Sequence, residues 1–254
     1  MAMSAKTKTF FDIWVDGNSP NNKYPQIVIL SERDKARAAV IPILSEVVKD
    51  HFVGLGVLKR IGEYRRALKT LENSVPTTKK IRSGDLGEIL ATEYIEQKMK
   101  YRVPVRRLRY KDDRNTAMRG DDVIGIRNAT RATQLLKAEC KSRINLGAGT
   151  VKSAANALMR HSARPNPSTL AFISRRLREQ NQHATALLIE RLQQNDVKDV
   201  DLEHLVFTFS GNDPLTALSE HVSSGKATLK RHLVGLVIED HQDFIRVVFE
   251  AAIK

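Results

Sequence analysis

Apolar and polar residues recur along the chain with two periods, one typical of strands and one typical of helices. Short apolar runs next to turn-forming residues predict strands, at 10–15, 26–30, 101–108, 122–126, 134–140, 168–174, 205–209 and 233–238. Apolar residues at helical spacing predict helices, at 31–51, 55–71, 82–98 and 151–161, and a long charged helix that reaches about residue 193. The closing run 244–253 fits either period.

Local signals place some of the boundaries between these elements. Residues 16–22 are rich in Asp, Gly, Asn and Pro and predict a turn between the first two strands. Ser31 is a suitable N-cap for the helix that follows. Pro165 and Pro167 are expected to stop the helix that starts near residue 151.

The pattern of elements changes at about residue 79. From there the expected order is helix, three strands, helix and strand, whereas residues 1–78 contain no cluster of catalytic residue types. We therefore predict a mixed α/β (α+β) protein whose mixed sheet is flanked by helices. An N-terminal lobe, residues 1–78, would precede a main domain, residues 79–254.

The net charge of the chain predicts the chemical class of its binding partner. The chain has 42 Lys and Arg against 29 Asp and Glu, a net charge of +13. Such an excess favours a polyanionic partner, with nucleic acid ahead of a membrane surface. A basic solvated surface or an acidic protein partner is the alternative.

Several classes of protein are excluded or disfavoured. Cys140 is the single cysteine of the chain, so an internal disulfide and a zinc ribbon are both excluded. Neither a long apolar run nor the apolar core of a signal peptide is present, so we expect a cytoplasmic protein without membrane contact. The segments 147–153 and 224–227 lack the full phosphate-loop pattern, so the chain has no ATP site of its own.

The strongest chemical signal is the triplet Glu139-Cys140-Lys141 at the end of an expected strand. Side chains alternate along a strand, so Glu139 and Lys141 share one face. A hairpin with the preceding strand would bring Asp122 beside Glu139, and Asp121 is the adjacent alternative. Two carboxylates can hold a divalent metal while a lysine positions or deprotonates water.

The helix before these strands contains two glycines, Gly84 and Gly87, where helix propensity disfavours them. Such residues allow a close approach between backbones, and they would let Glu88 reach the metal site. Tight helix packing with an exposed Glu88 is the plainer interpretation. Glu139 and Lys141 also have a plainer one, an ion pair on a solvated strand.

Taken together, Gly84-x-x-Gly87-Glu88, Gly120-Asp121-Asp122 and Glu139-x-Lys141 resemble the motifs of the PD-(D/E)xK nuclease superfamily. The resemblance implies a restriction-endonuclease-like αβββαβ core and Mg²⁺ as cofactor, with Mn²⁺ as a substitute. It also implies that Asp122, Glu139 and Glu88 bind metal and that Lys141 is catalytic. Gly120-Asp121 stands where the superfamily has its name-giving proline.

A narrower resemblance covers most of the chain. The strings 82–88, 119–122 and 138–142 are similar to those of the HamA family, the nuclease subunits of the Hachiman antiphage system. The resemblance implies a bacterial defence effector that a separate HamB-like helicase subunit restrains. Any ATP-driven step would then belong to that partner.

Two basic clusters are predicted to contact DNA phosphates, for which arginine geometry is suited. They are Arg102, Arg106, Arg107, Arg109 and Lys111 in the first cluster, and Arg175, Arg176 and Arg178 in the second. A solvated face or a protein interface would give the same pattern.

The sequence therefore predicts a Mg²⁺-dependent DNA endonuclease with Asp122, Glu139, Lys141 and Glu88 at its centre. A catalytically silent DNA-binding or scaffold subunit with the same fold is the first alternative. A basic protein-interaction module, whose acids only pair with arginines, is the second.

Overall fold

The fold is built on one mixed sheet of six strands in the order β1-β2-β6-β5-β4-β3. It is seen in a computed structural model that describes residues 9–19, 24–128, 133–194, 200–224 and 229–254. The strands are β1 Val15–Asn18, β2 Ile27–Glu32, β3 Val123–Asn128, β4 Thr133–Arg143, β5 Val200–Ser210 and β6 Lys230–Val237. The four central strands are parallel, and β1 and β3 are antiparallel edges. The predicted mixed α/β class is confirmed.

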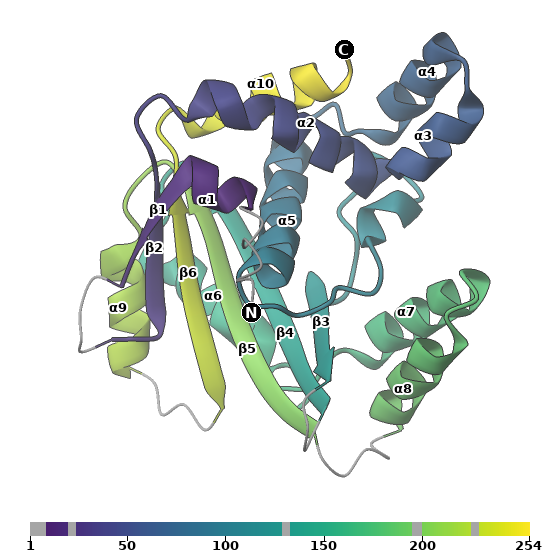
Figure 1. Cartoon of the computed structure of the whole chain (residues 1–254). Coiled ribbons are helices and arrows are strands. Elements are labelled where there is room, and N and C mark those ends of the chain that lie inside the picture. Colours follow the sequence, from purple (N-terminus) through teal and green to yellow (C-terminus); the bar gives the residue numbers. More distant parts are fainter. Residues whose placement is uncertain (1–8, 20–23, 129–132, 195–199, 225–228) are drawn as a thin grey trace, which may run out of the picture.

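One face of the sheet carries the larger hydrophobic core, which includes Leu136, Phe207 and Phe209 from the strands. The helices over this face are α1 Phe10–Trp14, α2 Arg37–Phe52, α5 Lys79–Gln97 and α10 His241–Ala252. Two shorter helices, α3 Leu55–Ile61 and α4 Tyr64–Ser74, extend from the end of α2 as a hairpin (Figure 1).

The opposite face is covered by two separate helix pairs with their own small cores. The helices are α6 Ala148–Met159, α7 Pro167–Glu179, α8 His183–Gln193 and α9 Leu215–Ser224. The pair α6 and α9 packs over the central strands, where Val206 and Leu233 meet Val151 and Leu218. The pair α7 and α8 packs at the edge formed by β3 and β4, as Figure 1 shows.

The N-terminal elements differ in type from the prediction. Residues 10–15 form the helix α1 followed by the start of β1, because Thr9 and Asp12 make a capping box that begins a helix. Ser31 lies inside β2 and caps nothing, and the helix begins at Arg37. The predicted turn at 16–22 is also wrong for residues 16–18, which belong to β1, while residues 20–22 lie outside the described ranges.

The strand predicted at 101–108 is absent. Arg102 forms a single antiparallel bridge with Ile126, after which the chain turns into a short 3-10 helix, η1, Arg107–Tyr110. Pro104 has no N–H to donate to a ladder, so it disfavours a longer pairing. Two strands, β3 and β4, therefore follow α5 where three were expected.

The strand predicted at 168–174 is the helix α7. Asn166 caps this helix by accepting a hydrogen bond from the backbone N–H of Ser168, and Pro167 occupies its first turn. Leu170, Ile173 and Leu177 are buried at helical spacing. The long charged helix predicted beyond it is interrupted at residues 180–182, so α7 and α8 are separate.

Other predictions agree with the structure or need only a small change. The strands at 26–30, 122–126, 134–140, 205–209 and 233–238 and the helices at 82–98 and 151–161 are confirmed, with bounds shifted by a few residues. The helix at 55–71 is divided at Gly62, whose positive φ of 71° ends α3. The ambiguous run 244–253 is helical in α10.

Strands from both sides of residue 78 share the sheet, because β2 pairs with β6 in parallel. The ring of Trp14 in α1 stacks on the ring of Phe244 in α10, with centroids 5.3 Å apart. The division into residues 1–78 and 79–254 stays a prediction about folding units. Across the described ranges, no helix is both long and apolar enough to cross a bilayer.

Candidate active site

The β3–β4 hairpin brings Asp122 beside Glu139. Val123 pairs with Ala138 at the start of β3, so the residues that come next in the register are Asp122 and Glu139. The carboxylate of Asp122 accepts a hydrogen bond of 2.8 Å from the backbone N–H of Cys140. Burial raises the pKa of both carboxyl groups, and the charge of Asp122 raises the pKa of Glu139 further. Two carboxyl groups that disfavour each other's ionised form are thus held together.

Glu139 and Lys141 project from the same face of β4, as strand alternation predicted. Lys141 Nζ lies 2.6 Å from Glu139 Oε1, and neither side chain is fully exposed. The charge of Lys141 opposes the rise in the pKa of Asp122 as well as that of Glu139. The charge of Lys141 therefore acts on both members of the carboxyl pair.

Glu88 reaches the same region from α5. Burial raises its pKa to about 8, the charge of Arg107 opposes the rise, and the charge of Asp122 adds to it. Arg107 Nε lies 3.3 Å from Glu88 Oε1, and an Arg107 amine group donates to the carbonyl oxygen of Asp122. Glu88 is thus a buried neighbour of Asp122, which rules out the plainer interpretation of an exposed glutamate.

The two glycines before Glu88 differ in their surroundings. A Cβ added to Gly87 would lie 3.3 Å from the Cβ of Ser142 in β4, so close packing of α5 on the strand explains this glycine. A Cβ added to Gly84 would meet nothing within 4 Å. The expected close approach is therefore real at Gly87 and absent at Gly84.

Asp121, the alternative to Asp122, is bound to another part of the molecule. Its carboxylate accepts a hydrogen bond of 2.6 Å from the backbone N–H of Asn166, and its own N–H donates to Thr169 Oγ1. Its second carboxylate oxygen lies 3.4 Å from Lys137 Nζ. These contacts fasten the start of α7 to the start of β3. The geometry therefore favours Asp122 over Asp121 beside Glu139.

Lys137 is a residue that the motif analysis missed. Its side chain is buried, and Nζ donates to the carbonyl oxygens of Leu158, Arg160 and Arg164 at 2.8–3.2 Å. The ammonium group thus holds the turn between α6 and α7 against β4. Its position two residues before Glu139, on the same face of an apolar strand, was the available signal.

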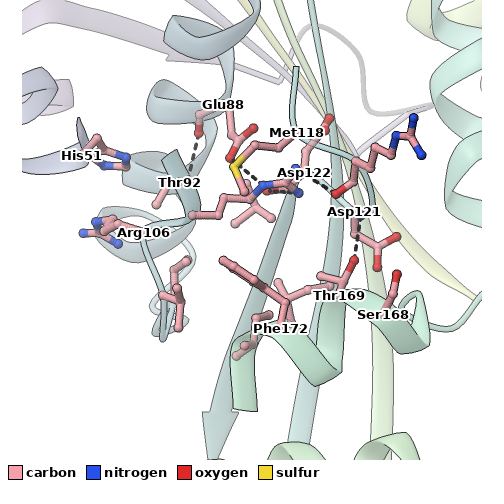
Figure 2. A pocket seen from close by; sticks show the side chains of 17 residues that line it. His51, Glu88, Thr92, Arg106, Met118, Asp121, Asp122, Ser168, Thr169 and Phe172 are labelled. Carbon is pink, nitrogen blue, oxygen red and sulfur yellow. Dashed lines mark hydrogen bonds and ion pairs between the residues drawn. The ribbon is translucent and has the colours of Figure 1, made fainter. Parts of the chain in front are cut away.

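A cavity of about 130 Å³ lies next to these acids. Glu88, Arg106 and Thr92 lie on one side of it and Asp121, Thr169 and Phe172 on the other, with Asp122 between them (Figure 2). Its remaining lining is mainly apolar. The carboxyl groups of Glu88 and Asp122 are therefore close to a space that is largely shielded from water.

The donor set fits a hard divalent cation, although it is not arranged as a closed metal cage. Among the described residues no group of three His, Cys, Asp or Glu side chains is placed to hold a metal. Glu88 pairs with Arg107 and Glu139 with Lys141. Mg²⁺ keeps several waters and needs only one or two carboxylates. The crowded carboxyl groups, whose ionised forms burial disfavours, would be stabilised by such a cation.

The predicted basic residues are mostly paired within the chain. In the first cluster, Arg102 bonds Thr185 and Gln182, Arg106 pairs with Glu93 and Glu96, Arg107 with Glu88, Arg109 with Asp50, and Lys111 with Asp85. In the second, Arg176 pairs with Glu179 and Arg178 with Glu190. Arg175 is exposed and forms no ion pair within the part of the chain that the structure describes. Their role in DNA binding stays a prediction, and the pairing weakens it because bonded cations are less available to phosphate.

Comparison with known proteins gives two findings. A family model described as HamA matches residues 8–252. The Hachiman protein HamA of Bacillus cereus is 27% identical over 191 residues, which span 75% of this chain and 66% of that protein. The aligned part is thus just under two thirds of the relative's length. Because the family model covers nearly all of the sequence, the chain belongs to the HamA family.

Proposed function

We propose that this protein is a metal-dependent endonuclease that hydrolyses phosphodiester bonds of DNA. One observation carries the proposal. Asp122 and Glu139 lie side by side in a largely buried site, burial raises the pKa of both carboxyl groups, the charge of Asp122 raises the pKa of Glu139 further, and Lys141 Nζ lies 2.6 Å from Glu139. Carboxyl groups whose ionised form is disfavoured by burial, next to a lysine, are suited to metal-assisted hydrolysis. Burying them for a structural purpose alone would lower the stability of the fold.

Each residue has a defined task in this proposal. Asp122 and Glu139 would hold a divalent cation, and Glu88 would join them once it leaves Arg107. The cation would polarise the phosphate and lower the pKa of a bound water. Lys141 would orient the attacking water through its ammonium group, which lies beside Glu139, or would accept the proton of that water in the neutral amine form.

The order of elements supports a place in the PD-(D/E)xK superfamily. A helix that carries Glu88 precedes a hairpin with Asp122 and Glu139, and three helices, α6 to α8, and the parallel strand β5 follow. The expected first strand of that core is replaced by one bridge at Arg102. The superfamily assignment therefore rests on the site and the hairpin.

We further propose that the protein is the effector of a bacterial antiphage complex with a helicase subunit. The similarity to a Hachiman protein supports this assignment. A helicase subunit that keeps the nuclease inactive until it releases it would also explain how a basic nuclease is restrained. Cleavage by the purified chain should therefore change when the helicase subunit is added, which can be measured on the same DNA.

The second candidate function is a DNA-binding subunit without catalytic activity. One contact favours it: Arg107 pairs with Glu88, so this carboxyl group already has a cation. The two functions differ in their dependence on metal. A silent subunit binds DNA equally well with Mg²⁺ or EDTA and leaves it uncut.

Metal-dependent cleavage should disappear when the site is changed. We expect the full chain to cut DNA with Mg²⁺ or Mn²⁺ and not with EDTA, and Glu139→Ala or Lys141→Ala to lower the cleavage rate by at least about 100-fold. The reason is loss of a metal ligand or of the group that positions water. Cleavage is measured on linear, circular and single-stranded DNA.

The ion pair between Glu46 and Lys49 on α2 provides the matched control. Glu46→Ala and Lys49→Ala should leave cleavage unchanged, because that pair lies in an exposed part of α2. Binding of DNA in EDTA should persist in Glu139→Ala. Equal cleavage by both site variants and the wild type would remove this site from the reaction.

A further inference from the structure

Four exposed cations border the candidate active site and have no acidic partner among the described residues: Arg119, Arg143, Lys152 and Arg160. They differ in this respect from the two predicted basic clusters, most of whose members are bonded within the chain. A cation without an acidic partner can contact a phosphate without first breaking an ion pair, and Arg143, which donates to the carbonyl oxygen of Ser142, has no ion pair to break. These four are therefore the more available set.

Two of the four lie along one exposed ridge, with Lys152 on α6 and Arg160 as the residue that caps the C-terminus of this helix. Lys152 and Asn156 are four residues apart and share a helix face, and Arg160 follows at the next four-residue step. Together with Gly149 they line a single open hollow on the surface. The opposite face of α6 is buried against the sheet. The ridge is thus held rigidly and faces outward.

This ridge belongs to the same side of the sheet as the candidate catalytic residues. In the register of β4 and β5, Glu139 is paired with Val206, and Val206 packs against Val151 of α6. Adjacent residues in neighbouring strands point to the same face. Glu139 therefore projects toward the side that α6 covers. Lys137, two residues before Glu139 on the same face of β4, donates to the carbonyl oxygen of Arg160 at 3.2 Å, so the end of α6 lies beside this strand.

Arg143 and Arg119 extend the set at two other borders of the site. Arg143 follows Lys141 by two residues in β4, so both start from the same face of the strand. Arg119 lines the cavity together with Asp121 and Asp122. The four cations thus come from α6, the end of β4 and the loop before β3, with the carboxyl pair among them.

We propose that Arg119, Arg143, Lys152 and Arg160 form the surface that binds the phosphate backbone of DNA and guides it to Glu139 and Lys141. The proposal rests on the proposed nuclease function and names its substrate-positioning residues. Eight residue steps separate Lys152 from Arg160, the cap of α6, which at the rise of a helix is about 12 Å and matches about three to four nucleotides of one strand. No base-reading group is required, so the surface recognises backbone and not sequence.

The test measures DNA binding separately from cleavage. Fluorescence anisotropy with a labelled DNA duplex is recorded in EDTA, in a Glu139→Ala background, at several salt concentrations. The change is Lys152→Ala with Arg160→Ala. We expect affinity to fall by at least about tenfold and the slope of log affinity against log salt to become shallower by about two, because two phosphate contacts are lost.

The matched control is Arg65→Ala with Lys69→Ala on α4, which removes the same charge from two exposed helix positions that have no acidic partner in the described parts of the chain. It should change affinity by less than about twofold. Equal losses in both double variants would show that only net charge matters and would overturn the proposal, as would an unchanged affinity in the α6 variant.

Thermal unfolding checks that all variants are folded, and alanine at exposed helix positions favours that. The nuclease proposal is tested by the rate of cleavage, so the two ideas fail in different measurements. Selective loss of binding in a chain that never cuts DNA would keep this surface and reject the nuclease. Binding of single-stranded DNA and of RNA to the same variants shows whether a duplex is preferred, and a preference for RNA would overturn the assignment to DNA.

Discussion

Burial raises the pKa of the Glu88 carboxyl group from 4.5 to about 8, although the charge of the neighbouring Arg107 favours the ionised form. Between these two pH values the folded chain binds more protons than the unfolded chain. The free energy of unfolding therefore falls as the pH rises through this window. A cation bound at Asp122 would reverse the effect by favouring the ionised form of Glu88.

Glu88→Gln should abolish this loss of stability, since glutamine has nearly the same shape and does not titrate. We expect the variant to resemble the wild type at pH 5 and to be more stable than it at pH 8.5 by about 1–3 kcal/mol, without divalent metal. Urea unfolding at pH 5, 7 and 8.5 measures the difference. A difference that is constant across these pH values would contradict the buried, protonated state of Glu88.

At the scale of single elements, the sequence predicted what short-range patterns determine. The β3–β4 hairpin and the shared face of Glu139 and Lys141 follow from strand alternation, and Asp122 follows from the hairpin. The strands predicted at 101–108 and 168–174 are wrong, because the apolar pattern there outweighed local signals that disfavour a strand. Pro104 blocks a ladder, and the cap at Asn166 starts a helix in an apolar run that also fits a strand.

The bonding of charged residues could not be predicted, because partners far apart in sequence decide it. Arg109 pairs with Asp50 and Lys111 with Asp85, at separations of 59 and 26 residues. The basic run in the sequence therefore predicted the positive charge of this segment correctly. It did not show that most of these side chains are already bonded within the chain. The role of Asp121 in holding α7 was hidden for the same reason.

Gly84→Ala and Gly87→Ala should have opposite effects on α5. Both replace a helical glycine, which favours the folded state by about 1 kcal/mol. At Gly84 nothing opposes the gain, because an added Cβ has open space. At Gly87 it meets Ser142, which is fixed by hydrogen bonds to Ser83 and His241, so we expect net destabilisation. Thermal unfolding of both variants tests this, and equal stabilisation would contradict the packing argument.

The whole molecule is organised around a sheet whose strands come from both ends of the chain. Removing residues 1–78 would uncover the edge of β6 that pairs with β2 and would expose Phe244, on which Trp14 stacks. An uncovered edge with unpaired backbone groups promotes aggregation. The lobe predicted from the sequence is therefore expected to be inseparable from the main domain.

A chain restricted to residues 79–254 tests this expectation. It should be insoluble, or should lack a cooperative unfolding transition, because its core and sheet edge are incomplete. Circular dichroism during urea unfolding, compared with the full chain, gives the measurement. A cooperative, monomeric fragment would show instead that residue 78 is a true domain boundary.

The turn that Lys137 holds has a consequence for the order of folding. His161, Ser162 and Ala163 all have positive φ, an arrangement that short-range forces disfavour in residues other than glycine. What stabilises it comes from two strands, through Lys137 of β4 and His204 of β5, whose ring bonds the carbonyl oxygen of Ala163. We therefore expect β4 and β5 to pair before this turn becomes stable. The connection from α6 to α7, and with it the hydrogen bonds between Asp121 and the start of α7, would then form after these two strands have paired.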